Sequence, residues 1–172
     1  MALRTLRVEP DEILRKKSKP VIDITASVLT LLDDMRDTMS HYGGVGLAAP
    51  QVGVLKRIIL IEDEDVFIEM LNPHIILEDG EQTSEEACLS VPYMVGSVPR
   101  PLSVCVSYTN RFGDGDVYKA SDNMSIIVSH EIDHLDGVLY KDKALPGTFR
   151  ENTQEYEKKK KRPGRAQSSV KK

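Results

Sequence analysis

Residues Ile126–Gly137 read IIVSHEIDHLDG, and this stretch predicts a buried helix with chemistry on one face. His130 and His134 are four residues apart, so on a helix both imidazoles stand on the same face and can reach one ion. Glu131 lies beside the first of them, where its carboxylate can meet a water without being a metal ligand. The apolar residues before the motif indicate burial. A bound metal explains two histidines and an acid there better than plain core packing does.

Two imidazoles are too few for a tight metal site, so this helix requires a third ligand from elsewhere in the chain. No histidine follows His134. The downstream acids Glu151, Glu155 and Glu157 lie at a distance that a thermolysin-like zinc peptidase could use. The competing candidate is Cys88, in the polar segment EEACLSVP, which would leave a fourth position open for water. The composition of that segment favours the cysteine but leaves a glutamate as an alternative.

The cysteine content and the first residues predict a cytoplasmic chain. MALRTLRVEPDE lacks the apolar segment of a secretory signal, and two cysteines cannot form a disulfide framework. Cys105 alternates with Val104 and Val106 in a strand-like run, so we expect it to be an inert core residue. No apolar run approaches the roughly 18 residues of a membrane span.

Outside the histidine helix, the pattern predicts an α+β fold with mainly antiparallel sheets packed around that helix. Apolar residues at helical spacing predict a helix over 24–42 that ends at Gly43. A second helix is expected over 123–135 and a third over 148–161. Because the strand-like runs come as a block rather than alternating with helices, antiparallel pairing is expected. These runs are 57–62, 67–72, 74–80, 102–110 and 115–120.

The segment GVGLAAPQ, Gly44–Gln51, has small residues that would let another backbone approach closely. The amide of Gln51 could polarise a carbonyl group. By itself this segment is equally well interpreted as a tight turn from helix into sheet.

Length and charge predict one domain over residues 1–149 and a helix with a basic, disordered tail over residues 150–172. The chain has 172 residues; the tail holds nine Lys or Arg against three Asp or Glu, leaving 14 against 24 in the remainder. Only the tail would therefore attract a polyanion, although such a run is commonly just a solvated terminus. Neither a membrane nor DNA is an expected partner.

GVGLAAPQ, EACLS and HEIDHLDG, in this order, resemble the three signature motifs of the peptide deformylases, and the opening stretch is also similar. The resemblance implies that Cys88, His130 and His134 hold the metal and that Glu131 is the catalytic acid. It also implies oxyanion contacts from the Gln51 side chain and the Leu89 backbone N–H. The implied ion is Fe(2+), with Zn(2+), Ni(2+) or Co(2+) as possible replacements.

The implied reaction is metal-assisted hydrolysis of the N-formyl group on the initiator methionine of newly made polypeptides, with release of formate. The peptide would lie as an added strand along Gly44 and Gly46, with Val45, Ile126 and Ile127 as walls of a methionine pocket. The resemblance also implies ribosome contact through the basic tail. The alternatives are a divergent deformylase with weak activity, a zincin-type metallopeptidase and a non-catalytic metal-bound module.

The sequence departs from the family pattern near two of the motifs. Ala87 stands where glycine is usual, one residue before the expected thiolate ligand, and Ser129 stands where glutamine is usual. Asn123 and Ser125 occupy positions that are frequently apolar. None of these changes removes a ligand, the acid or an oxyanion donor, so an active enzyme is still expected.

Overall fold

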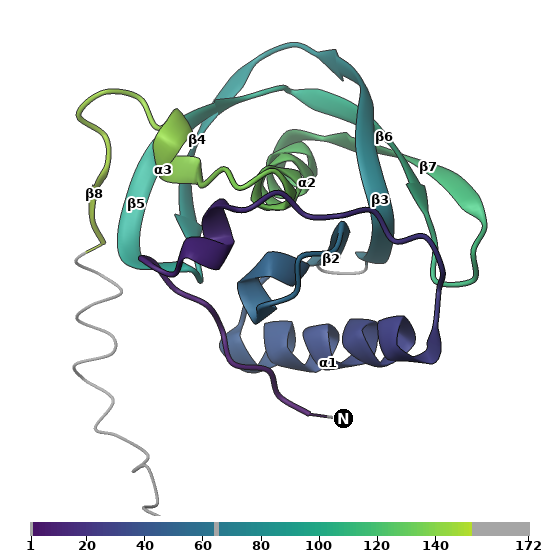
Figure 1. Cartoon of the computed structure of the whole chain (residues 1–172). Coiled ribbons are helices and arrows are strands. Elements are labelled where there is room, and N and C mark those ends of the chain that lie inside the picture. The colour runs from purple at the N-terminus through teal and green to yellow at the C-terminus, as the bar shows by residue number, and fades with distance from the viewer. Residues whose placement is uncertain (1, 64–65, 153–172) are drawn as a thin grey trace, which may run out of the picture.

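The computed structural model describes residues 2–63 and 66–152, and its strands form two antiparallel sheets (Figure 1). One sheet has five strands in the order β1-β2-β3-β6-β7, and the other has three in the order β4-β5-β8. The strands are β1 (Gly46–Ala48), β2 (Ile58–Asp63), β3 (Val66–Asp79), β4 (Gln82–Cys88), β5 (Val91–Arg100), β6 (Ser103–Thr109), β7 (Gly115–Ser121) and β8 (Arg150–Glu151). The α-helices are α1 (Ala26–Tyr42), α2 (Asp122–Leu135) and α3 (Tyr140–Lys143). Two short 3-10 helices in the described residues are η1 (Glu12–Arg15) and η2 (Ala49–Val52).

The predicted α+β class and the first two helices are confirmed. Helix α1 buries the apolar stripe Val28, Leu31, Leu32, Met35 and Met39. It ends where expected, because Gly43 adopts a left-handed conformation with φ of +69°, which a residue without a Cβ tolerates well. None of the described helices is long and apolar enough to cross a membrane.

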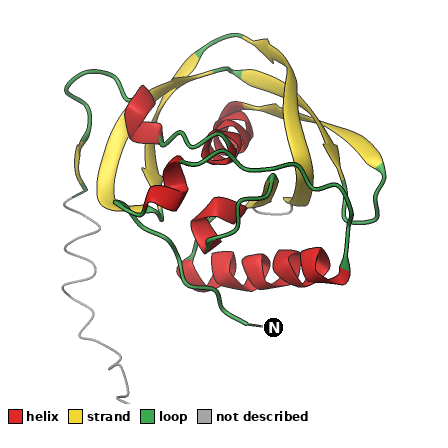
Figure 2. Ribbon diagram, viewed as in Figure 1, coloured by secondary structure: helices red, strands yellow, loops and turns green. Residues whose placement is uncertain are grey.

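Strand β2 lies between two layers of helix, which explains its unbroken apolar sequence. Ile58 and Leu60 pack into the hydrophobic cluster of α1, whereas Ile59 and Ile61 pack into the cluster of α2. All four side chains have no exposed surface. A strand that is covered on both faces needs apolar residues at every position rather than at alternate ones. The sheet therefore fixes α2 in the interior, where Figure 2 shows it enclosed by strands.

The sequence patterns missed the sheet that carries β4 and β5. β4 reads QTSEEAC and β5 contains two prolines and a glycine, so neither shows the apolar alternation of a typical strand. The two strands nevertheless pair from Gln82↔Arg100 to Cys88↔Val91. β3 is one long strand where two were expected, and its pairing with β6 shifts register on either side of His74 and Ile75.

Two further expectations are corrected. Arg150–Glu151 form β8, paired with Met94 and Val95 of β5, so the expected third helix does not begin at residue 148. The rest of that range lies outside the described residues. Cys105 is only partly buried and pairs with the exposed Leu77, because it faces away from the core that takes up the neighbouring valines.

The C-terminal end of α2 packs against the N-terminal segment through a glycine. Ser18 donates its backbone N–H to Leu135 O at 2.8 Å. Gly137 adopts φ of +74°, and a Cβ there would lie 2.6 Å from the carbonyl carbon of Arg15. The absence of a side chain at this position lets residues 15–18 lie directly against the end of the histidine helix.

We predict that Gly137→Ala lowers the free energy of unfolding by about 3 kcal/mol or more, because a left-handed backbone and a backbone clash add together. Gly147 is the matched control: its φ is +77°, but nothing lies within 4 Å of an added Cβ. Gly147→Ala should lose only the roughly 1–2 kcal/mol of the left-handed conformation. Urea denaturation measures both, and equal losses would show that the contact with Arg15 is unimportant.

Candidate metal centre and active site

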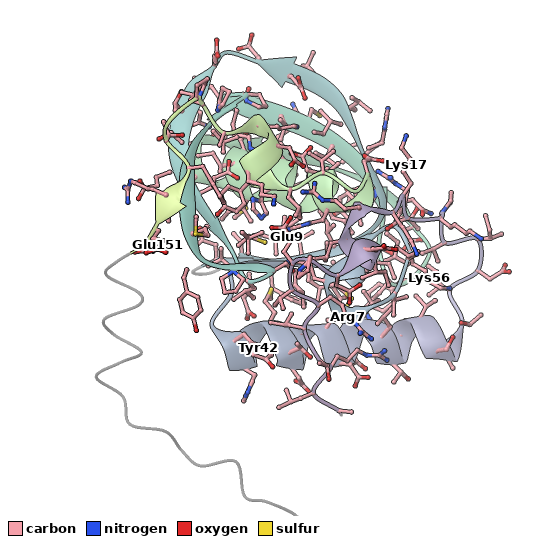
Figure 3. All side chains as sticks on the ribbon, turned by 60° about the vertical axis from the view of Figure 1, so that its left-hand side comes forward. Arg7, Glu9, Lys17, Tyr42, Lys56 and Glu151 are labelled. Atoms are coloured by element: carbon pink, nitrogen blue, oxygen red, sulfur yellow. The ribbon has the colours of Figure 1, made fainter. Side chains whose placement is uncertain are left out.

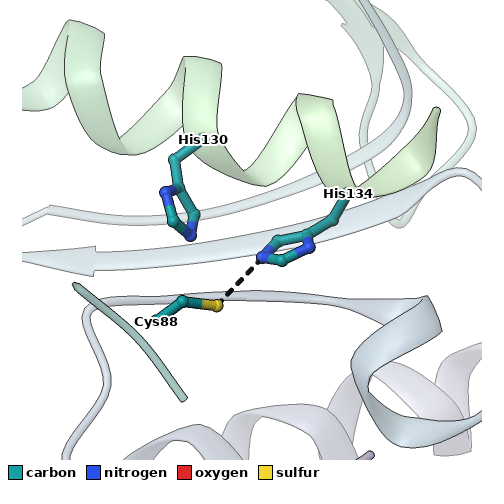
Figure 4. A group of neighbouring side chains, drawn as sticks. All are labelled: Cys88, His130 and His134. Atoms are coloured by element: carbon teal, nitrogen blue, oxygen red, sulfur yellow. Dashed lines mark hydrogen bonds between the residues drawn. The ribbon is translucent and has the colours of Figure 1, made fainter. Parts of the chain in front are cut away.

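One cysteine and two histidines meet between β4 and α2. The ligand atoms of Cys88, His130 and His134 all lie within 4.8 Å of one another, and Cys88 Sγ is 3.3 Å from His134 Nε2 (Figure 4). The helix places both imidazoles on its inner face, and Cys88 is the last residue of β4. The geometry thus brings the sequence-predicted cysteine to the histidine pair.

The glutamates considered as alternative ligands do not join this group in the described part of the chain. Glu151 is exposed on β8, opposite Met94 of β5. Glu155 and Glu157 lie outside the described residues. Among the residues that the structure covers, the group that can supply three donors to one ion is therefore the cysteine and the two histidines.

His130 is held by a buried carboxylate that the sequence analysis did not single out. Its Nδ1 lies 2.7 Å from Glu86 Oε2, and Glu86 receives two hydrogen bonds from Arg100, at 2.7 and 3.0 Å. Arg100 also donates to Asp133 at 2.6 Å, one residue before His134. A carboxylate on the second nitrogen of a metal-binding histidine fixes its tautomer and ring direction. The sequence offered one signal for these partners: Glu86 and Asp133 are acidic residues inside the motifs EEACLS and HEIDH.

The pKa values at the metal centre follow from burial and from these partners. Burial raises the pKa of Glu86, but hydrogen bonds from Arg100 and His130 outweigh it and hold that pKa below its usual value. Burial likewise opposes a charge on His130, whereas hydrogen bonds with Cys88 and Glu86 raise its pKa well above the usual value. Burial, aided by the charge of His130, lowers the pKa of His134 well below its usual value, favouring the neutral form that binds metals.

Glu131 lies in the interior and forms no salt bridge with any residue that the structure describes. Its Oε2 is buried and has no hydrogen-bond partner among the described residues. Burial raises its pKa to about 7; the charges of His130 and Arg100 oppose this rise and that of Glu86 adds to it. A carboxyl group with such a pKa can accept and release a proton near neutral pH. Gly46 makes room for it, since a Cβ there would lie 2.8 Å from the carboxyl carbon of Glu131.

The amide of Gln51 faces the cysteine in a fixed orientation. Its Oε1 accepts from Ala48 N at 2.8 Å, so its Nε2 points to Ser90 Oγ at 3.2 Å and to Cys88 Sγ at 3.5 Å. This bonding pattern sets which end of the amide faces the site. Ser90, the serine of EACLS, is a second residue that the sequence analysis passed over.

The N-terminal segment ties together the two turns that carry these residues. The backbone N–H of Arg7 donates to Gln51 O at 2.7 Å, and that of Glu9 donates to Ser90 O at 2.9 Å. Figure 3 labels both Arg7 and Glu9 on this segment. Two consecutive hydrogen-bonding positions of one extended chain therefore set the spacing between η2 and the turn after β4.

The remaining predicted site residues surround this centre to different degrees. A Cβ on Gly44 would lie 2.9 Å from Leu89 Cδ1, so this glycine backs onto the turn after Cys88. Val45 is half-exposed, at 49%. Ile126 is partly buried, whereas Ile127 packs into the core cluster beneath the sheet. Their roles in binding a peptide stay predictions.

The departures from the family pattern leave the centre intact. Ala87 is exposed on β4, at the register shift between Glu86 and Cys88. Ser129 is buried, and its Oγ has no hydrogen-bond partner in the described part of the chain. Ser125 is also buried, but its hydroxyl donates to Pro101 O at 2.9 Å. Asn123 is exposed.

The donor set fits a divalent transition-metal ion. One thiolate and two imidazoles are three ligands of the borderline-soft kind that zinc and ferrous iron accept, and they leave a further position free for water. One imidazole already has the carboxylate partner that metal-binding histidines usually have. A buried HExxH helix with a cysteine as third donor, inside antiparallel sheets, defines a metal-dependent hydrolase.

Comparison with known proteins gives the family. Residues 3–149 match the sequence model of the polypeptide deformylases. The peptide deformylase of Thermoanaerobacter pseudethanolicus is 48% identical over 145 residues, covering 84% of this chain and 91% of that protein. The chain therefore belongs to the polypeptide deformylase family, and it is a metal-dependent enzyme that removes the formyl group from N-formylmethionyl peptides.

Solved structures of peptide deformylases have the same fold as this chain. The crystal structure of a peptide deformylase from Legionella pneumophila has a TM-score of 0.83 and 36% identity, covering 95% of this chain and 100% of that one. A class I type b peptide deformylase from Acinetobacter baumannii, with Met-Ala-Ser bound, has a TM-score of 0.79 and 31% identity, covering 83% of this chain and 98% of that one.

We predict that Gly46→Ala lowers deformylation of a formyl-Met-Ala-Ser peptide by at least about tenfold while the bound metal is retained. The added methyl group would displace the Glu131 carboxylate, and a positioned acid–base group contributes on the order of 10²–10⁴ in rate. The control is Gly115→Ala, where nothing lies within 4 Å of an added Cβ. Unchanged activity in Gly46→Ala would contradict the close approach of Glu131 to this glycine.

Proposed function

We propose that this chain deformylates the initiator methionine of newly made polypeptides at the centre formed by Cys88, His130 and His134. The observation that carries the proposal is that three elements bring their functional groups to one site: α2 supplies His130, Glu131 and His134, β4 supplies Cys88, and η2 supplies the Gln51 amide. When an ion is bound by the three donors, the chemistry it supplies is Lewis acidity, which brings the pKa of water towards neutrality.

Glu131 is the general base and then the general acid of this mechanism. As base it takes a proton from the attacking water, whose oxygen forms a bond to the formyl carbon. As acid it returns that proton to the amine nitrogen when the carbon–nitrogen bond breaks, so formate and a free α-amine are the products. Its place beside His130, and the pKa of about 7 that burial gives it, support both roles.

Gln51 and the backbone N–H of Leu89 stabilise the oxygen of the tetrahedral intermediate. The Gln51 Nε2 is already aimed at Cys88 and cannot turn away without losing the bond between its Oε1 and Ala48 N. Donors that are oriented before the reaction cost no reorganisation when charge develops, and one such donor is worth about 10²–10³ in rate. Leu89 follows Cys88 directly, which places its amide next to the same site.

The peptide lies as an added strand along Gly44 and Gly46, with its methionine side chain near Val45, Ile126 and Ile127. β1 begins at Gly46 and pairs only with β2 among the described strands, so its other edge can accept a strand. The Acinetobacter baumannii relative has Met-Ala-Ser bound, which supports a methionyl peptide as the ligand.

The ion is Fe(2+), with Zn(2+), Ni(2+) or Co(2+) as possible replacements, and the enzyme works in the cytoplasm. The thiolate and imidazole set suits ferrous iron as well as zinc, and the resemblance to the deformylases favours iron. A cytoplasmic enzyme has direct access to newly made chains, and N-terminal processing of these chains is its part in protein biosynthesis.

The first test compares Glu131→Gln and Cys88→Ala with the unchanged chain, all loaded with Fe(2+) under anaerobic conditions. Glu131→Gln should keep one ion per chain and lose about 10²–10⁴ in formate release from formyl-Met-Ala-Ser. Cys88→Ala should lose the ion itself. Metal retained by Cys88→Ala would refute the proposed ligand set. No formate release by the metal-loaded, unchanged chain would refute the activity.

The basic run over residues 158–165 contacts ribosomal RNA phosphate in this proposal. It lies outside the described residues, so the test removes it without touching β8, whose Arg150 pairs with Glu85 of β4. A chain ending at Asn152 should deformylate peptides normally and pellet less with ribosomes at low salt. The full chain should lose ribosome binding as salt rises, and equal pelleting of both chains would overturn the contact.

A further inference from the structure

The imidazole of His130 is stacked against a buried tyrosine ring. Tyr140, the first residue of α3, has its ring centroid 5.9 Å from that of His130, and the two ring planes differ by 24°. Tyr140 is 1% exposed. His134 meets His130 edge-on instead, at 4.9 Å and 78°. The two histidines predicted to bind the metal therefore differ in their surroundings. Among the described residues, an aromatic ring is stacked on His130.

The tyrosine ring also packs against residues other than His130. Phe149, in the segment that leads to β8, lies 6.1 Å from it between ring centroids. A Cβ on Gly96 would come within 3.6 Å of the Tyr140 ring and 3.1 Å of Ala144, so a larger residue in β5 would disturb this packing. Tyr140 belongs to the cluster Leu14, Val91, Val98 and Leu139. Its ring is therefore packed on several sides in the interior.

Stacking supplies a restraint that the hydrogen bond to Glu86 does not. Hydrogen bonds with Glu86 and Cys88 hold the polar edge of the imidazole, but a hydrogen bond resists a tilt of the ring plane only weakly. A flat ring against its face removes this freedom, so that Nε2 points in one direction. His134 lacks the first restraint, because its Nδ1 has no hydrogen-bond partner among the described residues.

We propose that Tyr140 is a positioning residue that orients His130 for metal binding. This proposal rests on the proposed metal site. It assigns the role to the ring of Tyr140, which is not one of the three donors. It also makes α3 and the segment after it part of the support of the centre. We therefore expect metal affinity to fall when the aromatic ring is removed, and to stay unchanged when only the stability of the fold is lowered.

The test measures the affinity of the full chain for Co(2+) by competition with a chromogenic chelator, alongside the visible absorption of the bound cobalt. Tyr140→Leu should weaken Co(2+) binding about threefold to tenfold, the range that corresponds to one aromatic pair. It should also shift the cobalt absorption bands, which report ligand geometry. Tyr140→Phe, which keeps the ring, should bind as the unchanged chain does.

The matched control is Val98→Ala, which loosens the same hydrophobic cluster without removing the ring that covers His130. It should lower the melting temperature but leave cobalt affinity and absorption unchanged. Equal weakening in Val98→Ala and Tyr140→Leu, or unchanged binding in Tyr140→Leu, would overturn the proposal. If Tyr140→Leu does not fold, Tyr140→Met takes its place with the same expected loss. Failure of the unchanged chain to bind cobalt would instead refute the metal site.

Discussion

Glu86 carries the buried negative charge on which two strands of the smaller sheet and the histidine helix converge. It stands on β4, is paired with Arg100 at the end of β5 and accepts the ring N–H of His130 on α2. Arg100 continues to Asp133 on the same helix, and Asp133 binds Lys143 of α3. Removing one partner of such a group leaves an unpaired buried charge, at about 3–5 kcal/mol. One network of buried hydrogen bonds and ion pairs therefore links β4, β5, α2 and the metal ligand His130.

This interaction explains why the second sheet could not be predicted. Sequence patterns find strands by runs of apolar and β-branched residues, and they found β2, β6 and β7 in that way. β4 instead buries Glu86, which is 5% exposed, and β5 buries Arg100, which is 3% exposed. A buried ion pair looks like two surface residues in a sequence, because the pattern does not show that the partners will meet.

The candidate site was predictable to the extent that it is local. The spacing of His130 and His134 on one helix needs no tertiary information, and the predicted end of α1 at Gly43 needs only the backbone freedom of glycine. The third donor is different. Residue types left Cys88 and a downstream glutamate open, and only the resemblance to a family decided between them. What brings Cys88 to the histidines is the pairing of β4 with β5, together with the N-terminal segment bonded to Gln51 and Ser90.

Some buried polar atoms of the centre have hydrogen-bond partners and others have none, and this difference matches their proposed roles. Glu86, Arg100 and the Nδ1 of His130 have every partner that a buried charge requires. Glu131 Oε2 and His134 Nδ1 are buried without a hydrogen-bond partner among the described residues. A buried polar atom without a hydrogen bond lowers the stability of the fold by about 1–3 kcal/mol. Proteins keep such atoms mainly at functional sites. The paired groups hold the geometry, whereas the carboxylate of Glu131 stays free to exchange protons. A cation paired with Glu131 would lower the pKa of its carboxyl group, so that the group would no longer take up a proton near neutral pH.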